Sequence, residues 1–174
     1  MHVYPDSNKF IENKVYNFIL LLSRNKVFYT KFDLSDTFQN RIILIFLHIS
    51  FIFIKIKREK KILHFKEFYQ KVFDLIFKNL DLNMREIGYG DVAINKNMKF
   101  LVKTFYNILL KSENYNKINN ENKRKFLFKY LTLNNRDKSI INQDLIRYFD
   151  EYHSFCLDLS SEKVLKGDLN FNYK

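Results

Sequence analysis

The sequence predicts an all-α fold, a single compact bundle of about six helices in which residues 1–174 form one domain. Three observations support this prediction. Apolar residues recur at spacings of three and four along most of the chain, which is the period of an amphipathic helix. The chain is long enough to bury a core without disulfides or metal. It also contains neither an internal repeat nor a domain linker.

The first helix is expected to begin at Pro5 to Ser7, because Asp and Ser are favoured N-cap residues. One apolar stripe then continues through Ile11, Val15, Phe18 and Leu22. The helix is expected to end near Arg24 to Lys26, where basic residues suit a helix C-terminus. Residues 27–34 are interpreted as a connector. Three side chains at the end of this connector and just after it offer a second N-cap: Asp33, Ser35 and Asp36.

The most apolar stretch runs from Ile42 to Ile54, and its only weakly polar residues are His48 and Ser50. A membrane span needs about 20 apolar residues, and this run is shorter. It is bounded by Arg41 and by the basic segment 55–58. Its β-branched content also permits a strand. The length of the run and its helical neighbours favour a central helix that is buried on most sides.

The clearest helical pattern follows a charged connector at residues 59–61. Its apolar face contains Phe65, Tyr69, Val72, Ile76 and Leu80. A later stripe contains Met98, Leu101, Val102, Phe105, Ile108 and Leu109. The remaining segments are expected to be a polar loop at 112–122, a short helix at 123–133, a turn at 134–139 and a last helix at 141–155. The pattern then fades, and residues 160–174 are predicted to be a flexible tail.

Between these two long helical patterns lies the stretch Leu80 to Lys96, which reads LDLNMREIGYGDVAINK. Two of the three glycines in the chain, Gly88 and Gly90, are found here one residue apart. We expect a specific bend with a positive φ at one of them, a conformation that other residues adopt at a cost. Val92 to Ile94 is expected to be buried. For the charged residues Arg85, Glu86 and Asp91, two interpretations stay open: an ion-pair network that holds the turn, or direct contact with a partner.

This stretch resembles the signature of the ubiquinol–cytochrome c chaperone family. The matching residues are Leu80, Asp81, Met84, Arg85, Glu86, Gly88, Gly90, Asp91, Lys96, Lys99, Phe105 and Tyr106. A second block comprises Asp36, Thr37, Phe38 and Arg41, followed by Leu47 and His48. The likeness extends loosely from about residue 33 to about residue 136. It implies a helical, non-enzymatic assembly factor for respiratory complex III that acts on cytochrome b.

Motifs that carry chemistry are not found in the sequence. It has no nucleophile elbow, phosphate-binding loop, dinucleotide fingerprint or zinc-protease motif, so we expect no enzymatic activity and no cofactor. His64 and Glu67 are three residues apart on a predicted helix, but two ligands do not make a metal site. The single cysteine, Cys156, excludes an internal disulfide and any multi-cysteine metal site.

The chain is strongly basic, with a net charge of +11 and a pI of about 9.6. Such a balance suggests a ribosome, a nucleic acid or an anionic membrane surface as partner. However, the abundant residues Lys, Asn, Ile, Phe and Tyr all have AT-rich codons, so part of this charge is attributed to genome composition. A basic helical nucleic-acid-binding or ribosome-binding module is therefore the alternative function, and an integral membrane protein is the third.

The partner-binding surface is predicted to lie between residues 85 and 105, where the resemblance is densest. The residues assigned to it are Arg85, Glu86, Gly88, Tyr89, Gly90, Asp91, Lys96, Lys99 and Lys103. The expected client is newly made cytochrome b, with a second assembly factor as a further candidate partner and no small-molecule substrate. The first residues lack the basic-then-apolar order of a secretory signal. We therefore expect a bacterial cytoplasmic protein, with peripheral attachment to the inner face of the membrane as the second option.

Overall fold

The computed structural model describes residues 7–58, 65–134 and 143–173. In these ranges the chain forms only helices, apart from one isolated β-bridge between Leu34 and Leu133. The helices are α1 (Ser7–Ser23), α2 (Val27–Thr30), α3 (Phe38–Arg58), α4 (Phe65–Glu86), α5 (Asp91–Ser112), η1 (Tyr115–Lys117), α6 (Asn120–Phe128), α7 (Gln143–Asp158) and α8 (Ser161–Lys166). Six of the α-helices in the described ranges have nine or more residues. The predicted all-α bundle is therefore confirmed.

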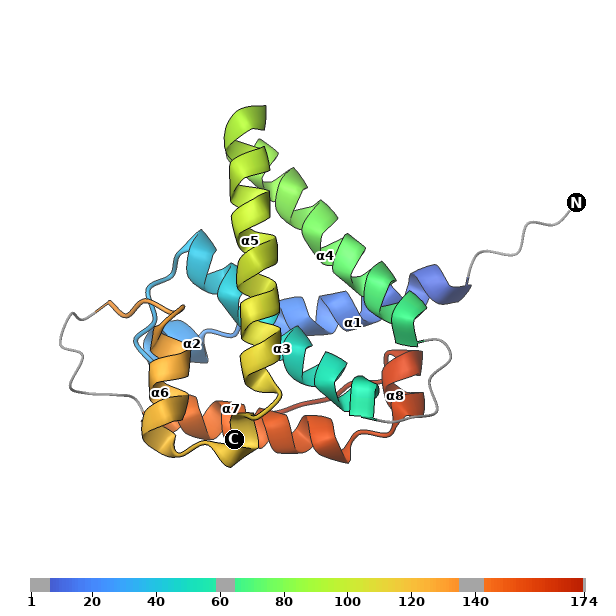
Figure 1. Cartoon of the computed structure of the whole chain (residues 1–174), viewed down its shortest axis with the longest axis vertical. Helices are drawn as coiled ribbons and strands as arrows, with labels where there is room; N and C mark the ends of the chain where they lie inside the picture. The colour runs from blue at the N-terminus through green and yellow to red at the C-terminus, as the bar shows by residue number, and fades with distance from the viewer. Residues whose placement is uncertain (1–6, 59–64, 135–142, 174) are drawn as a thin grey trace, which may run out of the picture.

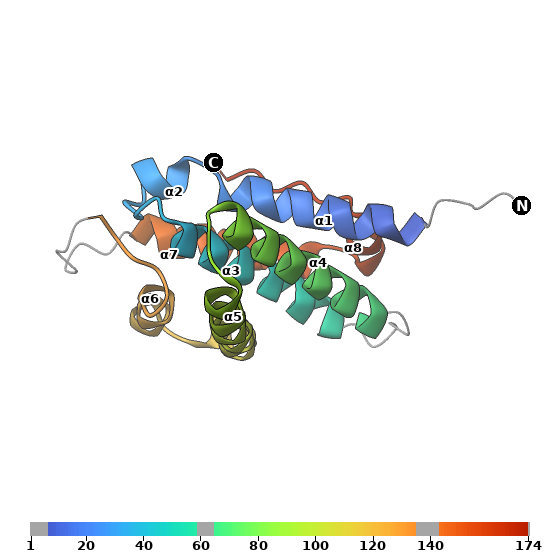
Figure 2. The ribbon, with the colours of Figure 1, turned by 90° about the horizontal axis from the view of Figure 1, so that it is seen from above.

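Helix α3 is the centre of the bundle, and α1, α4, α5, α7 and α8 all pack against it (Figures 1 and 2). Every residue from Ile42 to Ile54 is buried. By length and composition alone α3 could cross a membrane, but 83% of its most apolar 18-residue window is buried inside the protein. Its burial by neighbouring helices accounts for its apolar character. The prediction of a central helix that is buried on most sides is thus confirmed for this stretch.

The polar side chain at the middle of α3, His48, is fully buried and hydrogen-bonded at both ring nitrogens. Its Nδ1 lies 2.6 Å from the Leu44 carbonyl oxygen, and its Nε2 lies 2.8 Å from the Tyr148 hydroxyl oxygen. Because a carbonyl only accepts, Nδ1 carries the proton and Nε2 accepts from Tyr148. The Tyr152 hydroxyl donates to the His48 carbonyl at 3.3 Å. Burial lowers the pKa of His48 to about 4, so the neutral ring joins α3 to α7.

A second buried polar group, the Asn40 side chain, joins the first turn of α3 to the segment after α6. Its amide nitrogen donates to the Ser35 and Thr132 carbonyl oxygens, both at 2.7 Å. Its oxygen accepts from the Thr132 N–H at 2.9 Å, so the whole amide is satisfied. The Asn40 N–H donates to the Thr37 hydroxyl at 3.2 Å. Thr37 is therefore the N-cap of α3, in place of the earlier residues that the sequence offered.

A flexible tail was predicted for residues 160–174, but the described part of this range, 160–173, packs against the core. They begin with the short helix α8, and the chain then runs back over α7 with Leu169, Phe171 and Tyr173 packed against the core. The Phe171 ring lies 5.1 Å from the Tyr152 ring, and the Tyr173 ring lies 5.0 Å from the Tyr148 ring, centroid to centroid. These apolar residues alternate along an extended segment. A search for the helical period therefore does not find them.

Smaller differences concern where elements begin and end. The expected connector at 27–34 contains α2, and the expected polar loop at 112–122 contains η1. The short helix expected at 123–133 is α6, which ends at Phe128, so residues 129–133 are not helical. Most of the predicted turn at 134–139, together with the predicted start of the last helix at 141, lies outside the described residues.

The buried neutral His48 predicts that the protein loses stability in acid. The unfolded histidine takes up a proton near pH 6.5, whereas the folded one does so only near pH 4. The free energy of unfolding should fall as the pH decreases through this window, by up to about 3 kcal/mol. Burial also lowers the pKa of His153, which adds to the effect in the same direction.

Urea unfolding as a function of pH measures this dependence. The variant carrying His48→Leu with Tyr148→Phe removes both partners of the buried hydrogen bond. It should show a weaker dependence of the unfolding free energy on pH between 6.5 and 4, with the remainder due to His153 and the carboxylates. An unchanged slope in this variant would show that His48 does not titrate as the structure implies.

Candidate functional site

Helices α4 and α5 form a hairpin whose tip projects from the bundle, while the rest of both helices packs against α1 and α3 (Figure 1). In the view from above, α5 is seen along its axis, with α1, α3 and α7 on one side and no labelled helix on the opposite side (Figure 2). The tip of the hairpin is the stretch from Ile87 to Gly90, which the sequence singled out by its glycines. The predicted partner-binding residues therefore occupy the tip and one arm of this projection.

The turn at the tip is closed by the backbone of Gly88. The Tyr89 N–H donates to the Met84 carbonyl at 3.0 Å, and the Gly88 N–H donates to the Arg85 carbonyl at 2.9 Å. This pair of bonds is a Schellman motif, which needs a left-handed residue after the helix. Gly88 has a φ of +97°, as expected from the sequence. Gly90 has a φ of −76° and is the N-cap of α5, so the predicted strain lies at Gly88 alone.

Arg85 ties the two arms of the hairpin together across this turn. Its Nε lies 2.7 Å from a carboxylate oxygen of Asp81, and its Nη1 lies 2.6 Å from one of Asp91. The hydrogen bonds that Arg85 donates to these carboxylates, Asp81 first and then Asp91, raise the pKa of the Arg85 guanidinium. Asp91 lies in the first turn of α5 and Arg85 in the last turn of α4, where their charges suit the helix dipoles. The ion-pair interpretation therefore holds for Arg85 and Asp91, with Asp81 as the third member in place of Glu86.

The inner face of α5 is part of the core. Leu101, Phe105 and Ile108 are buried on this face. The Phe105 ring lies 5.3 Å from the Phe46 ring of α3 and 5.6 Å from the Phe73 ring of α4, centroid to centroid. Phe105, one of the residues that carry the family resemblance, is thus a core residue that fixes α5 in place.

The outer face of α5, by contrast, is exposed and combines positive charge with apolar side chains. Lys96, Lys99 and Lys103 are exposed, and within the described ranges none of their ammonium groups forms an ion pair. Between and beyond them lie three exposed apolar side chains: Val92 (86% exposed), Phe100 (60%) and Leu110 (62%). We call these six residues the outer face of α5. Val92 was expected to be buried with its neighbours, but only Ile94 of that stretch is.

Exposed large apolar side chains are concentrated on the hairpin. Those of the hairpin are Leu82, Ile87, Tyr89, Val92, Phe100, Tyr106 and Leu110, and in the described residues only Leu21 lies elsewhere. Exposed apolar side chains gathered in this way on an otherwise well-packed protein are typical of an interaction surface. Sequence reasoning missed the apolar part of this surface. The available signal was that Val92, Phe100 and Leu110 fall outside the apolar stripe that faces the core.

The two sequence blocks that carry the family resemblance meet at an open cavity of about 210 Å³ beneath the hairpin tip. Phe38 and Arg41 of α3 line it together with Leu80 and Glu86 of α4. The other lining residues are Tyr16, Leu20, Ser23, Arg24, Ile42, Ile45, Asn83 and Ile87. Its floor is thus largely apolar, and its rim is polar and charged. No sequence pattern indicated this cavity, because it exists only when α1, α3 and α4 pack together.

Arg41 at the rim of this cavity is held in position by its neighbours. Its Nε and Nη2 donate to the two carboxylate oxygens of Asp36 at 2.8 and 3.0 Å. The guanidinium also lies 5.7 Å from the centroid of the Tyr29 ring. The hydrogen bond from Arg41 lowers the pKa of Asp36, which stays ionised. The block around Asp36 therefore fixes the rim from one side, as Arg85 fixes the tip from the other.

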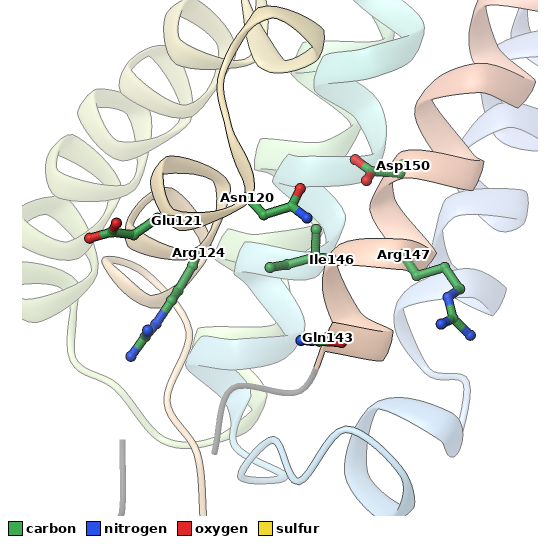
Figure 3. Close-up of a pocket in the computed structure, with 7 residues that line it drawn as sticks. All are labelled: Asn120, Glu121, Arg124, Gln143, Ile146, Arg147 and Asp150. Carbon is green, nitrogen blue, oxygen red and sulfur yellow. The ribbon is translucent and has the colours of Figure 1, made fainter. Parts of the chain in front are cut away.

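A second, larger cavity of about 680 Å³ lies between α6 and α7 (Figure 3). Except for Ile146, its lining residues are polar or charged: Asn120, Glu121, Arg124, Gln143, Arg147 and Asp150. Asp150 is paired with Lys123 at 2.8 Å, so its charge is compensated within the protein.

Metal ligands do not gather in the described part of the chain, where no group of three or more His, Cys, Asp or Glu side chains could hold an ion. His64, one half of the pair considered from the sequence, lies outside the described residues. The two histidines in the described residues, His48 and His153, are surrounded by core side chains and not by other metal ligands. His48 is hydrogen-bonded in the core, and the His153 ring packs against the Phe51 ring at 5.3 Å.

The family model described as ubiquinol-cytochrome C chaperone matches residues 30–117, a range that contains α3, α4 and α5. Among solved structures, the chain is similar to one described as the crystal structure of the Cbp3 homolog from Brucella abortus. The TM-score is 0.80 at 24% sequence identity, over 96% of this chain and 91% of that chain. At this identity the likeness shows a shared fold. No curated protein matches the chain.

The conformation of Gly88 predicts a difference between the two glycines of the tip. Nothing lies within 4 Å of a Cβ added at either position, so the cost of a substitution comes from the backbone alone. Gly88→Ala should lower the free energy of unfolding by about 1 kcal/mol or more, because alanine avoids a positive φ. Gly90→Ser should keep or raise the stability, because Ser is a favoured N-cap. Chemical denaturation of both variants measures this, and equal effects at the two positions would contradict the turn geometry.

Proposed function

This chain belongs to the ubiquinol–cytochrome c chaperone family, and from that membership we propose that it acts as an assembly chaperone of respiratory complex III whose client is newly made cytochrome b. The proposal is supported by one observation above all. The α4–α5 hairpin projects from the bundle and presents exposed apolar and unpaired basic side chains together. A chaperone must offer such a surface to an incomplete membrane protein, because the client also exposes apolar segments.

We propose that the function is binding and not catalysis. The side chains of the described residues that most often carry catalysis are occupied in the core. Burial raises the pKa of the Cys156 thiol, which makes it a poor nucleophile. His48 is held between the Leu44 carbonyl and the Tyr148 hydroxyl. These observations support a protein that works through contact surfaces.

The predicted site residues divide into two groups under this proposal. Arg85, Gly88, Gly90 and Asp91 set the geometry of the tip through the ion pairs and the turn. The residues proposed to contact a partner are Glu86, Tyr89, Lys96, Lys99 and Lys103. Tyr89 is exposed at the tip, and Glu86 lines the cavity beneath it. This cavity is about the size of one large apolar side chain, so we propose that it accepts an anchor residue of the client.

Charge reversal on the outer face tests the proposal. The variant carrying Lys96→Glu with Lys99→Glu should fold with a nearly unchanged melting temperature, because exposed charge changes usually alter stability by only about half a kcal/mol. In cells that lack the wild-type protein, this variant should support much less assembled complex III, measured by native electrophoresis and by the haem spectrum of cytochrome b.

A matched control reverses two exposed lysines on other helices. Lys129→Glu with Lys163→Glu makes the same change in net charge at the end of α6 and on α8. It should leave complex III at the wild-type level. Normal assembly with the Lys96 and Lys99 variant would move the partner-binding surface away from α5. An equal loss with both variants would mean that overall charge, as in a nucleic-acid-binding module, matters more than this face.

A further inference from the structure

We propose that the outer face of α5, defined above by three lysines and three apolar residues, docks on an anionic lipid surface. This inference adds a second partner to the proposed function. It concerns the purified protein and a bilayer, so it stands or falls independently of the client. It rests on the placement of side chains along the helix, on their charge, and on the shape of the face.

The side chains of the face form one continuous strip. Val92 and Leu110 are 18 residues apart, which is about five helical turns, so they point in the same direction. Lys96, Lys99 and Lys103 lie between them on the same side of the helix, opposite the buried residues of the inner face. Helix α5 has 22 residues and is therefore about 33 Å long. A strip of this length can lie flat against a planar surface.

The charge of the strip is positive and uncompensated. Asp91 is the only acidic residue of α5, and it is paired with Arg85 at the tip. Lys111, which is also exposed, adds a further positive charge in the last turn. A lysine close to an anionic membrane contributes about 1 kcal/mol of attraction, which corresponds to about fivefold in binding. Three lysines on one strip therefore suffice for measurable binding when apolar contacts assist them.

The apolar members of the strip favour lipid over nucleic acid. Single-stranded RNA is bound by stacking successive bases on several aromatic rings, but of the three apolar members of the strip only Phe100 has a ring. Short aliphatic side chains are suited to the boundary between headgroups and acyl chains, while lysines extend their ammonium groups to the phosphates. Lipid docking would bring Tyr89, at the end of the strip, to the level of the membrane.

The shape of the strip also favours lipid over an acidic protein. It is the convex side of a single helix, and neither of the two cavities described above is lined by its residues. Tight protein interfaces centre on anchor side chains buried in pockets; the pocket proposed for the client's anchor lies beneath the hairpin tip, and the strip along α5 provides none of its own. A bilayer needs no pocket, since it deforms around each side chain.

Cosedimentation of the full chain with vesicles tests the proposal. We expect binding to vesicles of phosphatidylcholine mixed with phosphatidylglycerol, weaker binding as salt rises, and little binding to vesicles of phosphatidylcholine alone. The variant with Lys96→Gln, Lys99→Gln and Lys103→Gln should bind at least tenfold more weakly. The control with Lys26→Gln, Lys129→Gln and Lys163→Gln, which removes the same charge from other elements, should bind within about threefold of the wild type.

A second variant tests the apolar contribution. Val92→Ser with Phe100→Ser changes only exposed side chains, so it should fold normally, and it should also bind the anionic vesicles more weakly. The proposal is overturned if the wild type does not bind anionic vesicles, or if the control triple variant loses as much binding as the α5 triple variant. Binding to single-stranded RNA without binding to vesicles would assign the face to RNA. If the wild type does not bind vesicles and the Lys96→Glu, Lys99→Glu variant still loses complex III, the proposed chaperone function stands and the proposed lipid docking is wrong.

Discussion

The contact between α3 and α5 is the interaction on which the candidate site depends. Helix α3 is buried along its length, and Phe105 of α5 inserts its ring among Phe46 and Phe53 of α3 and Phe77 of α4. The side chains of the inner face of α5 are buried in this packing, and those of the outer face point away from the core. Buried polar groups on α3 are satisfied by other elements, His48 by α7 and Asn40 by the segment after α6. The core is therefore complete without the hairpin tip.

The tip is built so that its geometry does not depend on a partner. Gly88 allows the chain to reverse within a few residues, and Arg85 links both arms through Asp81 and Asp91. Exposed ion pairs contribute little stability individually, so their main effect here is to fix the direction in which α5 leaves the turn. Tyr89 is thereby held at the end of a defined projection. The residues that carry the family resemblance in this segment include the core residue Phe105 and the turn residues Arg85, Gly88 and Asp91.

Much of the fold followed from the sequence, because helical periodicity reports directly on which residues face a core. The central helix at 42–54 was predicted from its length and its helical neighbours, and a positive φ at Gly88 or Gly90 was predicted because two of the three glycines fall in one turn. Packing of residues 169–173 was not, since their apolar side chains alternate along an extended segment. The exposure of Val92 was missed because a short apolar stretch has no resolvable period, and Ile94 alone supplies its buried part. The cavity shared by Phe38, Arg41, Leu80 and Glu86 depends on how three helices cross, which local patterns do not encode.

The central claim is that a partner meets this protein at the hairpin tip, and site-specific photo-crosslinking tests it most directly. A benzophenone amino acid in place of Tyr89 changes an exposed residue and leaves the turn glycines intact. In cells that make complex III, irradiation should link this position to cytochrome b. The same group in place of Lys163, exposed on α8, should give no such product. Crosslinking to cytochrome b from position 163 and not from position 89 would contradict the account and place the client on the other side of the bundle.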